Sequence, residues 1–241
     1  MKILAIMPVY NEDDILRWII EKLVAQRIDV LVLDNHSTDS SHDAAVNAGA
    51  RVEMFGREFD FDDAELTDEV MTRSCVSDAD WIIVHSADEV FRSPALDESY
   101  RAFIERADAA GANVIDHNTR LYVPTDNVFK YGDPEEFFRY WVSENAEGFG
   151  THTQERTFKP HASLRSETFL HSVIRDDKTV FAERGLRKHY TVRSGNHAIR
   201  KHHERKTRFR DSGEYFYRRR EPMAIWSLHN KELQYDSPEE P

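Results

Sequence analysis

Three short apolar runs, together with a fourth segment that reads as a strand, constrain the fold of this chain more than any other feature. They lie at residues 2–9, 30–33, 51–55 and 81–84, in units of about 25 residues, and the segments between them carry helical patterns. Short apolar runs that alternate with helices are typical of strands buried in a parallel sheet. The sequence therefore predicts an α/β fold with a mostly parallel sheet flanked by helices.

The segments between the apolar runs carry signals of amphipathic helices. Asn11 stands where a helix N-cap belongs, and apolar residues from Ile15 to Leu23 then repeat at the spacing of one helix face. Gly49 suits the position that follows a helix end. Further helices are expected over three segments: residues 41–48, 66–77 and 97–109.

Three of the predicted strands end in polar residues of kinds that bind ligands. These ends are residues 8–12, 34–39 and 86–89. Parallel sheets bind ligands beyond the carboxyl ends of their strands, so the three segments are expected to meet. This convergence predicts an active site in the first half of the chain.

The composition excludes several classes of protein. Cys75 is the single cysteine, so no disulfide framework can form within the chain. Pro8 cuts the first apolar run too early for a secretory signal, and no stretch approaches the 18 apolar residues that span a membrane. We therefore expect a cytoplasmic protein.

The net charge of −12 conceals a strongly basic segment. Residues 184–220 contain thirteen Lys or Arg against three Asp or Glu, and the remaining chain carries about −22. Two interpretations are open: a cationic helix on an acidic protein, or a basic lid or rim that attracts an anionic ligand. A diphosphate, a nucleic acid and a membrane surface are such ligands, and the last would place the protein at the periphery of a membrane.

Neither of the common glycine-rich phosphate-binding motifs occurs in the chain. No GxGxxG follows the first predicted strand, and no GxxxxGK[ST] is present. A divalent cation held by carboxylates is the usual alternative, with Mn²⁺ or Mg²⁺ bridging protein and phosphate oxygens. Asp88 and Glu89 directly follow an apolar strand and are placed to hold such a cation.

Three motifs resemble those of the family 2 glycosyltransferases of GT-A fold. They are Pro8-Val9-Tyr10-Asn11-Glu12, Leu33-Asp34-Asn35-His36-Ser37-Thr38-Asp39 and Ala87-Asp88-Glu89. They occur in the order and at the intervals of that family, within residues 1–95. The resemblance implies a metal-dependent enzyme that moves a sugar from a nucleotide-diphosphate donor, a UDP-sugar being favoured. The acceptor would be a hydroxyl of a glycan, a lipid-linked glycan or another molecule.

The resemblance implies roles for the first two motifs. Pro8, Tyr10 and Glu12 should line the nucleotide pocket, and Asp34 should accept hydrogen bonds from the base. Other interpretations stay open, because Tyr10 also fits an aromatic residue at a strand end. Asp34 also fits an acid that forms a turn before the next helix.

The third motif is the one that binds the metal in this family. The resemblance implies that Asp88 is the metal ligand and that the neighbouring Ala87 lies against the sugar nucleotide. Family members commonly carry an acid where this chain has Ser86. This departure is expected to alter donor choice or to weaken metal affinity.

A stretch around His189 resembles one near the C-terminus of related transferases, where a histidine completes the metal shell. His171 competes for that role in the sequence. Arg193, Arg200 and Lys201 would then stabilise negative charge on the leaving diphosphate.

The domain organisation implied is a single domain in three parts. The first part is a nucleotide-binding half. The second is an α+β half that packs on the same sheet and supplies the acceptor site and the lid. The third is a loose tail. The three parts are residues 1–112, 113–234 and 235–241. Within the second half, residues 196–210 are expected to form a basic helix.

The sequence offers several candidates for the catalytic base. A single-displacement transfer needs a base that takes the proton of the acceptor hydroxyl, and inversion is implied by the family. The candidates are Asp133, Glu135, Glu136 and Glu155. We choose Glu155, although an ion pair with Arg156 explains it equally well.

Two rival functions stay open at this stage. A nucleotidyltransferase can share such a sheet, but its usual glycine-rich loop after the first strand is missing from this sequence. A protein that binds nucleic acid or an anionic surface through residues 184–220 is the rival from another class.

Overall fold

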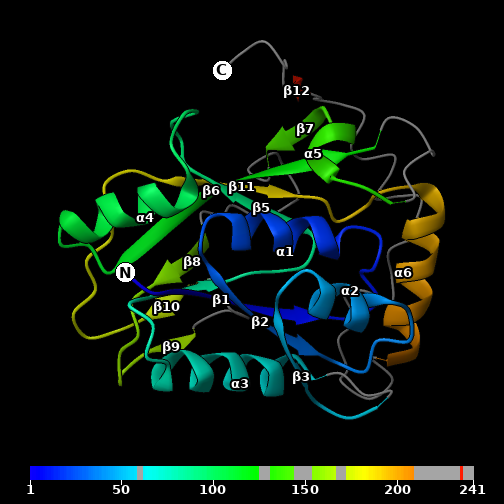
Figure 1. Cartoon of the computed structure of the whole chain (residues 1–241), viewed down its shortest axis with the longest axis horizontal. Coiled ribbons are helices and arrows are strands. Elements are labelled where there is room, and N and C mark those ends of the chain that lie inside the picture. The colour runs from blue at the N-terminus through cyan, green and yellow to red at the C-terminus, as the bar shows by residue number, and fades with distance from the viewer. Residues whose placement is uncertain (59–61, 125–130, 144–153, 167–171, 209–233, 236–241) are drawn as a thin grey trace.

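The structure is a computed structural model in which the strands form one large sheet and a separate two-stranded sheet (Figure 1). It describes residues 1–58, 62–124, 131–143, 154–166, 172–208 and 234–235. Helices cover the large sheet on both faces. The mixed α/β architecture predicted from the sequence is confirmed.

The first half of the chain forms a parallel sheet in the order β3-β2-β1-β4. Its strands are β1 (Ile3–Val9), β2 (Asp29–Asp34), β3 (Arg51–Met54) and β4 (Trp81–Val84). The helices between them are α1 (Leu16–Ala25), α2 (Ser41–Asn47) and α3 (Asp63–Val76). In this register Val9 lies opposite Asp34, so β1 and β2 end together.

Side chains of the central strand β1 alternate between two apolar layers. Ile3, Ala5 and Met7 pack in the layer that contains residues of α1, α2 and α4 (Tyr100–Ala109). Ile6 points to the opposite layer, which contains residues of α3. Because both faces of the sheet are buried at β1, β2 and β4, these three strands read as apolar runs. The edge strand β3 is partly exposed and includes Arg51 and Glu53.

The second half of the chain continues the same sheet beyond β4. Its strands are β5 (Glu89–Arg92), β6 (Val114–Val123), β7 (Tyr140–Ser143), β8 (Gln154–Phe158), β11 (Gly185–His189) and β12 (Gln234–Tyr235). β8 lies between β4 and β6 and is antiparallel to both. β11 lies between β5 and β6, antiparallel to β5 and parallel to β6. The remaining elements are α5 (Pro134–Phe137), β9 (Arg165–Ser166), β10 (Val173–Ile174) and α6 (Gly195–Arg208).

The helix ends agree with the sequence at two places. Gly49 has φ 95° after α2, in the left-handed region that favours glycine. The basic helix expected over residues 196–210 is α6. Within the described residues, the helices are all too short or too polar to cross a membrane.

The start of α1 differs from the prediction. Asn11 was expected to cap this helix, but the helix begins at Leu16 and Asn11 lies at φ 53°. The side-chain amide of Asn11 donates to Thr38 Oγ1 and to Glu204 Oε1, at 3.2 and 3.0 Å. The N-cap prediction is wrong because this side chain binds the loop after β2 and helix α6 instead of the first turn of α1.

Tyr100 ties α4 to the second half of the sheet. Its hydroxyl lies 2.6 Å from His117 Nε2 on β6 and 2.6 Å from Thr157 Oγ1 on β8, and all three side chains are buried. His117 Nδ1 lies 2.9 Å from the backbone oxygen of Gln154, so Nδ1 carries the proton. Burial lowers the pKa of His117 to about 3, which keeps the ring neutral. Tyr100 therefore donates to Nε2.

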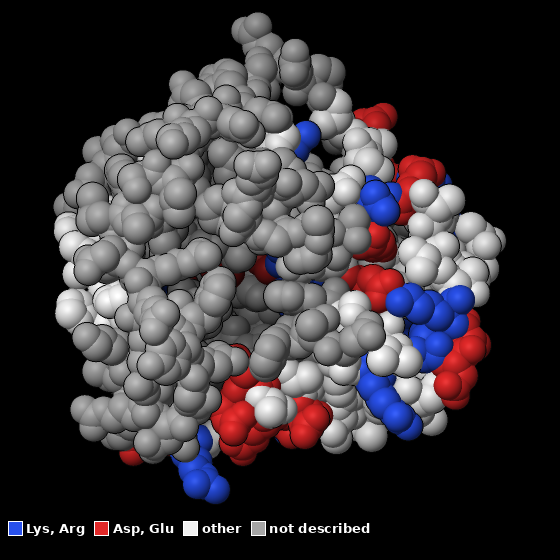
Figure 2. All heavy atoms as spheres, turned by 180° about the vertical axis from the view of Figure 1, so that it is seen from behind, with Lys and Arg blue, Asp and Glu red and all other residues white. Residues whose placement is uncertain are grey.

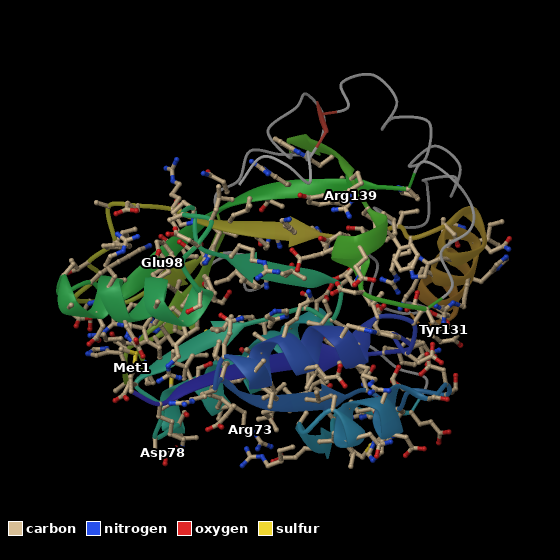
Figure 3. All side chains as sticks on the ribbon, turned by 45° about the horizontal axis from the view of Figure 1, so that its top comes forward. Met1, Arg73, Asp78, Glu98, Tyr131 and Arg139 are labelled. Carbon is tan, nitrogen blue, oxygen red and sulfur yellow. The ribbon has the colours of Figure 1, made fainter. Side chains whose placement is uncertain are left out.

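Replacing Tyr100 with phenylalanine should leave two polar groups in the core without their partner. We expect Tyr100→Phe to lower the free energy of unfolding by about 1–3 kcal/mol, measured by urea denaturation. Tyr131→Phe is the matched control, because Tyr131 is 62% exposed and its hydroxyl lies 3.5 Å from Asp13 (Figure 3). The control should change stability by less than about 0.5 kcal/mol. Equal losses in the two variants would contradict this account.

Candidate active site

The carboxyl ends of β1, β2 and β4 lie side by side, as the sequence predicted. The backbone N–H of Asn35 donates to Val9 O, and that of His85 donates to Ile6 O, each at 3.0 Å. Helix α6 stands across this edge of the sheet, in the direction in which β1 points (Figure 1). Polar residues from both halves of the chain meet here.

Asp88 and His189 approach each other where β5 pairs with β11. The backbone N–H of Tyr190 donates to Asp88 O at 2.8 Å, which fixes the two segments together. Nε2 of His189 lies 3.4 Å from Oδ2 of Asp88 and 2.9 Å from the hydroxyl of Thr191. The structure thus brings together the two residues predicted as metal ligands.

The Asp88 carboxyl is surrounded by positive charge. Burial alone would raise its pKa, but His189, Arg193 and Lys201 together hold the pKa well below its usual range. The side chain remains 17% exposed. Asp88 is therefore an ionised carboxylate that solvent can reach, which is what a divalent cation requires of a ligand.

Glu89, the next residue, is bound to cations of the protein itself. It is 1% exposed, and its Oε1 lies 2.5 Å from Arg187 Nη1 and 3.7 Å from Arg156 Nη2. Its Oε2 accepts a hydrogen bond from the backbone N–H of Ser86 at 3.1 Å. Burial would raise the pKa of Glu89, but Arg187 and Arg156 lower it to about 2.

These side chains fit a divalent cation. Oxygens of Asp88 and Glu89 and a nitrogen of His189 all lie within 4.8 Å of one another. Carboxylate oxygens suit Mg²⁺ and Mn²⁺, and an imidazole nitrogen is a common ligand of transition metals. Because Arg187 already neutralises Glu89, Asp88 and His189 are the side chains that would hold the ion.

Arg193 joins the loop after β1 to the start of α6. It is completely buried, and its guanidinium lies 2.7 Å from one carboxylate oxygen of Asp14 and 2.8 Å from the other. The same guanidinium donates to Glu12. Lys201 lies 2.6 Å from the other oxygen of Glu12 and also binds two backbone oxygens of this loop. Two of the three cations predicted to bind a diphosphate, Arg193 and Lys201, thus contact carboxylates of the protein.

Asp34 is buried at the end of β2 and holds the turn that follows. Its Oδ1 accepts a hydrogen bond from the backbone N–H of Ser37 at 2.9 Å, and its Oδ2 lies 3.2 Å from Nδ1 of His42. These contacts are those of the turn-forming acid considered from the sequence. A further role in binding the base stays a prediction.

The remaining residues predicted for the nucleotide pocket lie at the same edge. Pro8 is half-buried in β1, opposite Leu33 of β2, and Tyr10 is half-buried just after β1. Ala87 is buried between β4 and β5. Contact of these residues with a nucleotide stays a prediction.

Glu155, the base predicted from sequence, lies on β8 and is bound to a cation. Its carboxylate lies 2.6 Å from Nζ of Lys178 and also accepts a backbone hydrogen bond from β10. Arg156 reaches Glu89, as successive residues of a strand point to opposite faces. The role of Glu155 as base stays a prediction. His171, the competing histidine, lies outside the described residues.

The basic segment is neutralised by carboxylates of the protein wherever its side chains are described. Each of these cations forms an ion pair: Arg184, Arg187, Lys188, Arg193, Arg200 and Lys201. On the face shown in Figure 2, described acidic and basic side chains likewise lie beside one another. Residues 209–220 of the segment lie outside the described residues. The described cations thus bind the protein itself.

The sequence does not single out Asp14 or Arg187 as site residues. Asp14 reads as an ordinary acid in the first turn of a helix. Arg187 is one of several cations in the basic segment, although an arginine within a strand is itself a sign of a buried carboxylate partner. Nothing in one sequence identifies that partner as Glu89, which lies 98 residues away.

Comparison with known families gives one match over most of the chain. The model of glycosyl transferase family 2 matches residues 4–226. No curated protein matches the chain.

Several solved structures share a weaker likeness. A mycobacterial protein is 20% identical over 50% of this chain and 41% of its own, with a TM-score of 0.35. Glucosyl-3-phosphoglycerate synthase from Mycobacterium tuberculosis, in complex with Mn²⁺, UDP and glucosyl-3-phosphoglycerate, is 16% identical over 49% and 44%, with a TM-score of 0.34. Mannosyl-3-phosphoglycerate synthase from Rubrobacter xylanophilus is 20% identical over 54% and 44%, with a TM-score of 0.37. This chain thus spans less than half of the length of each structure.

Removing the cation that faces Glu89 should destabilise the protein strongly. We expect Arg187→Met to lower the free energy of unfolding by about 3–5 kcal/mol near neutral pH, because a carboxylate would stay buried without its partner. Arg17→Met is the matched control, since Arg17 is exposed and pairs with Glu21 one helical turn away. Its effect should stay below about 0.5 kcal/mol. Urea denaturation measures both.

The same variant should respond to acid in a defined direction. The pKa of Glu89 falls from 4.5 to about 2 in the folded protein. The ionised carboxylate therefore stabilises the fold fully above the ordinary glutamate pKa. This stabilisation is lost as the pH falls through about 2. Without Arg187, protonation of Glu89 relieves the buried charge. The difference between wild type and Arg187→Met should therefore shrink from about pH 7 to about pH 4. An unchanged difference would contradict this assignment.

Proposed function

The chain belongs to glycosyl transferase family 2, and on that premise we propose that it transfers a sugar from a nucleotide-diphosphate donor to an acceptor hydroxyl. One observation carries the proposal: Asp88, ionised and reachable by solvent, lies beside His189 at the edge where β1, β2 and β4 end. Ligands of parallel sheets bind at such an edge. A UDP-sugar is the donor we favour.

The proposed donor site includes a divalent cation. Asp88 and His189 would hold Mn²⁺ or Mg²⁺, which when bound neutralises the charge of the donor diphosphate. Pro8, Tyr10 and Asp34 would contact the nucleoside from the loops after β1 and β2. Ser86 occupies the place of the first acid of the motif, and its backbone N–H donates to Glu89.

The proposed cationic contribution comes from α6 and the residues before it. Lys201 contacts Glu12 and two backbone oxygens of the loop after β1, so this ammonium stands beside the proposed nucleotide pocket. Arg193 is enclosed by Glu12 and Asp14. We assign Arg193 the task of holding the loop after β1 on α6, with its charge acting on the diphosphate at longer range.

The proposed transfer inverts the sugar carbon in a single displacement. Glu155 is the base we propose for the acceptor hydroxyl, and it is the ionic partner of Lys178. We restrict the proposed lid to α6, because residues 185–189 form β11 within the sheet.

The experiment that tests the proposal is titration calorimetry of nucleoside diphosphates with and without Mn²⁺. The wild-type chain should bind UDP only when the cation is present. Asp88→Asn should reduce this metal-dependent affinity by at least about tenfold, because the amide lacks the charge that attracts the ion. Asp78→Asn is the matched control, since Asp78 is exposed and lies at the opposite end of the sheet from α6 (Figure 3). If Asp88→Asn binds UDP with unchanged Mn²⁺ dependence, Asp88 is not the metal ligand.

Hydrogen exchange tests the restricted lid. We expect residues 195–204 and 86–90 to exchange more slowly together when UDP and Mn²⁺ are added, because paired charges offset the entropy of ordering a segment. Exchange in α3 should not change and serves as the internal control. Slower exchange of α6 with anionic vesicles or DNA, and not with UDP, would instead favour a surface-binding function.

A further inference from the structure

One face of α6 is turned toward the loop after β1. The helix starts at a Ser194 cap, whose Oγ accepts the backbone N–H of His197 at 3.0 Å. Lys201, one turn beyond His197 on the same face, reaches the backbone oxygens of that loop. His197 is therefore part of the face that meets the proposed donor site.

His197 is buried with one ring nitrogen unpaired. His197 is 6% exposed, and its Nδ1 accepts a hydrogen bond from the backbone N–H of Arg193 at 3.4 Å. Its Nε2 has no hydrogen-bond partner among the residues that the structure describes. Leaving a buried polar group unpaired costs about 1–3 kcal/mol, so such a group calls for an explanation.

The contact with Arg193 determines which nitrogen carries the proton. Burial, with the charges of Arg193, Lys201 and Arg200, holds the pKa of His197 far below its usual range, so the ring is neutral. A neutral imidazole has a single N–H, and Nδ1 uses its lone pair to accept from the backbone. The proton is therefore on Nε2. That nitrogen is a hydrogen-bond donor, and neither a metal ligand nor a base.

The surroundings of this donor attract anions. The ring lies at the N-terminal end of α6, where the helix dipole is positive. Arg193, Arg200 and Lys201 add positive charge, and Asp88 is near enough to affect the titration of His197. A cation held at Asp88 would bring the oxygens of a diphosphate to this end of the helix.

We propose that the Nε2–H of His197 donates a hydrogen bond to a phosphate oxygen of the nucleotide diphosphate that is bound at Asp88. This inference rests on the proposed function and assigns a diphosphate contact to a residue of the basic helix that was expected over residues 196–210. Because Nε2 is covered in this structure, the contact requires the groups around it to move when the nucleotide binds. A neutral donor fits an anion without adding a further charge to a site already rich in cations.

Calorimetry with three probes tests the contact. UDP, inorganic pyrophosphate and uridine are titrated into wild type and His197→Phe, each with Mn²⁺. We expect His197→Phe to bind UDP and pyrophosphate about tenfold or more weakly, and by similar factors, because it lacks the N–H. Uridine should bind the two proteins alike. His203→Phe is the matched control, an exposed histidine of the same helix, and should bind all three probes as wild type does.

A measurement on the wild-type protein keeps the test independent of the folding of the variant. Nitrogen NMR of ¹⁵N-histidine-labelled protein should show His197 with Nδ1 unprotonated and Nε2 protonated. Addition of UDP with Mg²⁺ should shift the Nε2–H signal. A proton on Nδ1, or a signal that UDP at saturation does not move, would overturn the proposal.

The outcomes separate this inference from the proposed function. If wild type and His197→Phe bind UDP with Mn²⁺ equally well, the proposed His197 contact is wrong and the proposed function stands. A loss for uridine as large as the loss for pyrophosphate also overturns it, because the contact would then be to the nucleoside. Wild type that binds neither UDP nor pyrophosphate overturns both the function and the inference.

Discussion

Buried ion pairs between the two halves of the chain hold the candidate site together. Arg193, from the second half, binds Glu12 and Asp14 after β1, and Arg187 of β11 binds Glu89 after β4. Burying charges is costly, and the cost is offset only when partners meet with good geometry. Each pair therefore fixes one arrangement of β11 and α6 against the strand ends, and looser arrangements leave a charge unpaired.

This arrangement explains the uneven distribution of charge along the sequence. The acidic residues at the strand ends need cations nearby, and the described part of the basic segment supplies them. Asp88 differs from the adjacent Glu89, because several cations act on it while its carboxylate stays partly exposed. An acid that the protein stabilises in ionised form without fully enclosing it is available for a metal.

The fold was predictable from the sequence because strands with both faces buried leave a plain apolar pattern. The meeting of Asp88 with His189 was predictable through the family resemblance, and the structure places them 3.4 Å apart. The start of α1 was not predictable, because the side chain of Asn11 donates hydrogen bonds to Thr38 and Glu204 instead of capping the helix. The ion pair between Asp14 and Arg193 was not predictable either, because the spacing of residues in a sequence indicates contacts only within one helix or strand.

The contacts of Arg193 also affect how this protein folds during its synthesis. The guanidinium and its partner Asp14 are separated by 179 positions in the chain. During synthesis the carboxylates after β1 leave the ribosome long before their cation does, so they remain solvated and repel one another until then. Contacts of such high sequence separation form late, after loop closure has been overcome. A nascent chain that stops short of Arg193 therefore lacks the cation that joins the loop after β1 to the start of α6, and its candidate site stays unassembled.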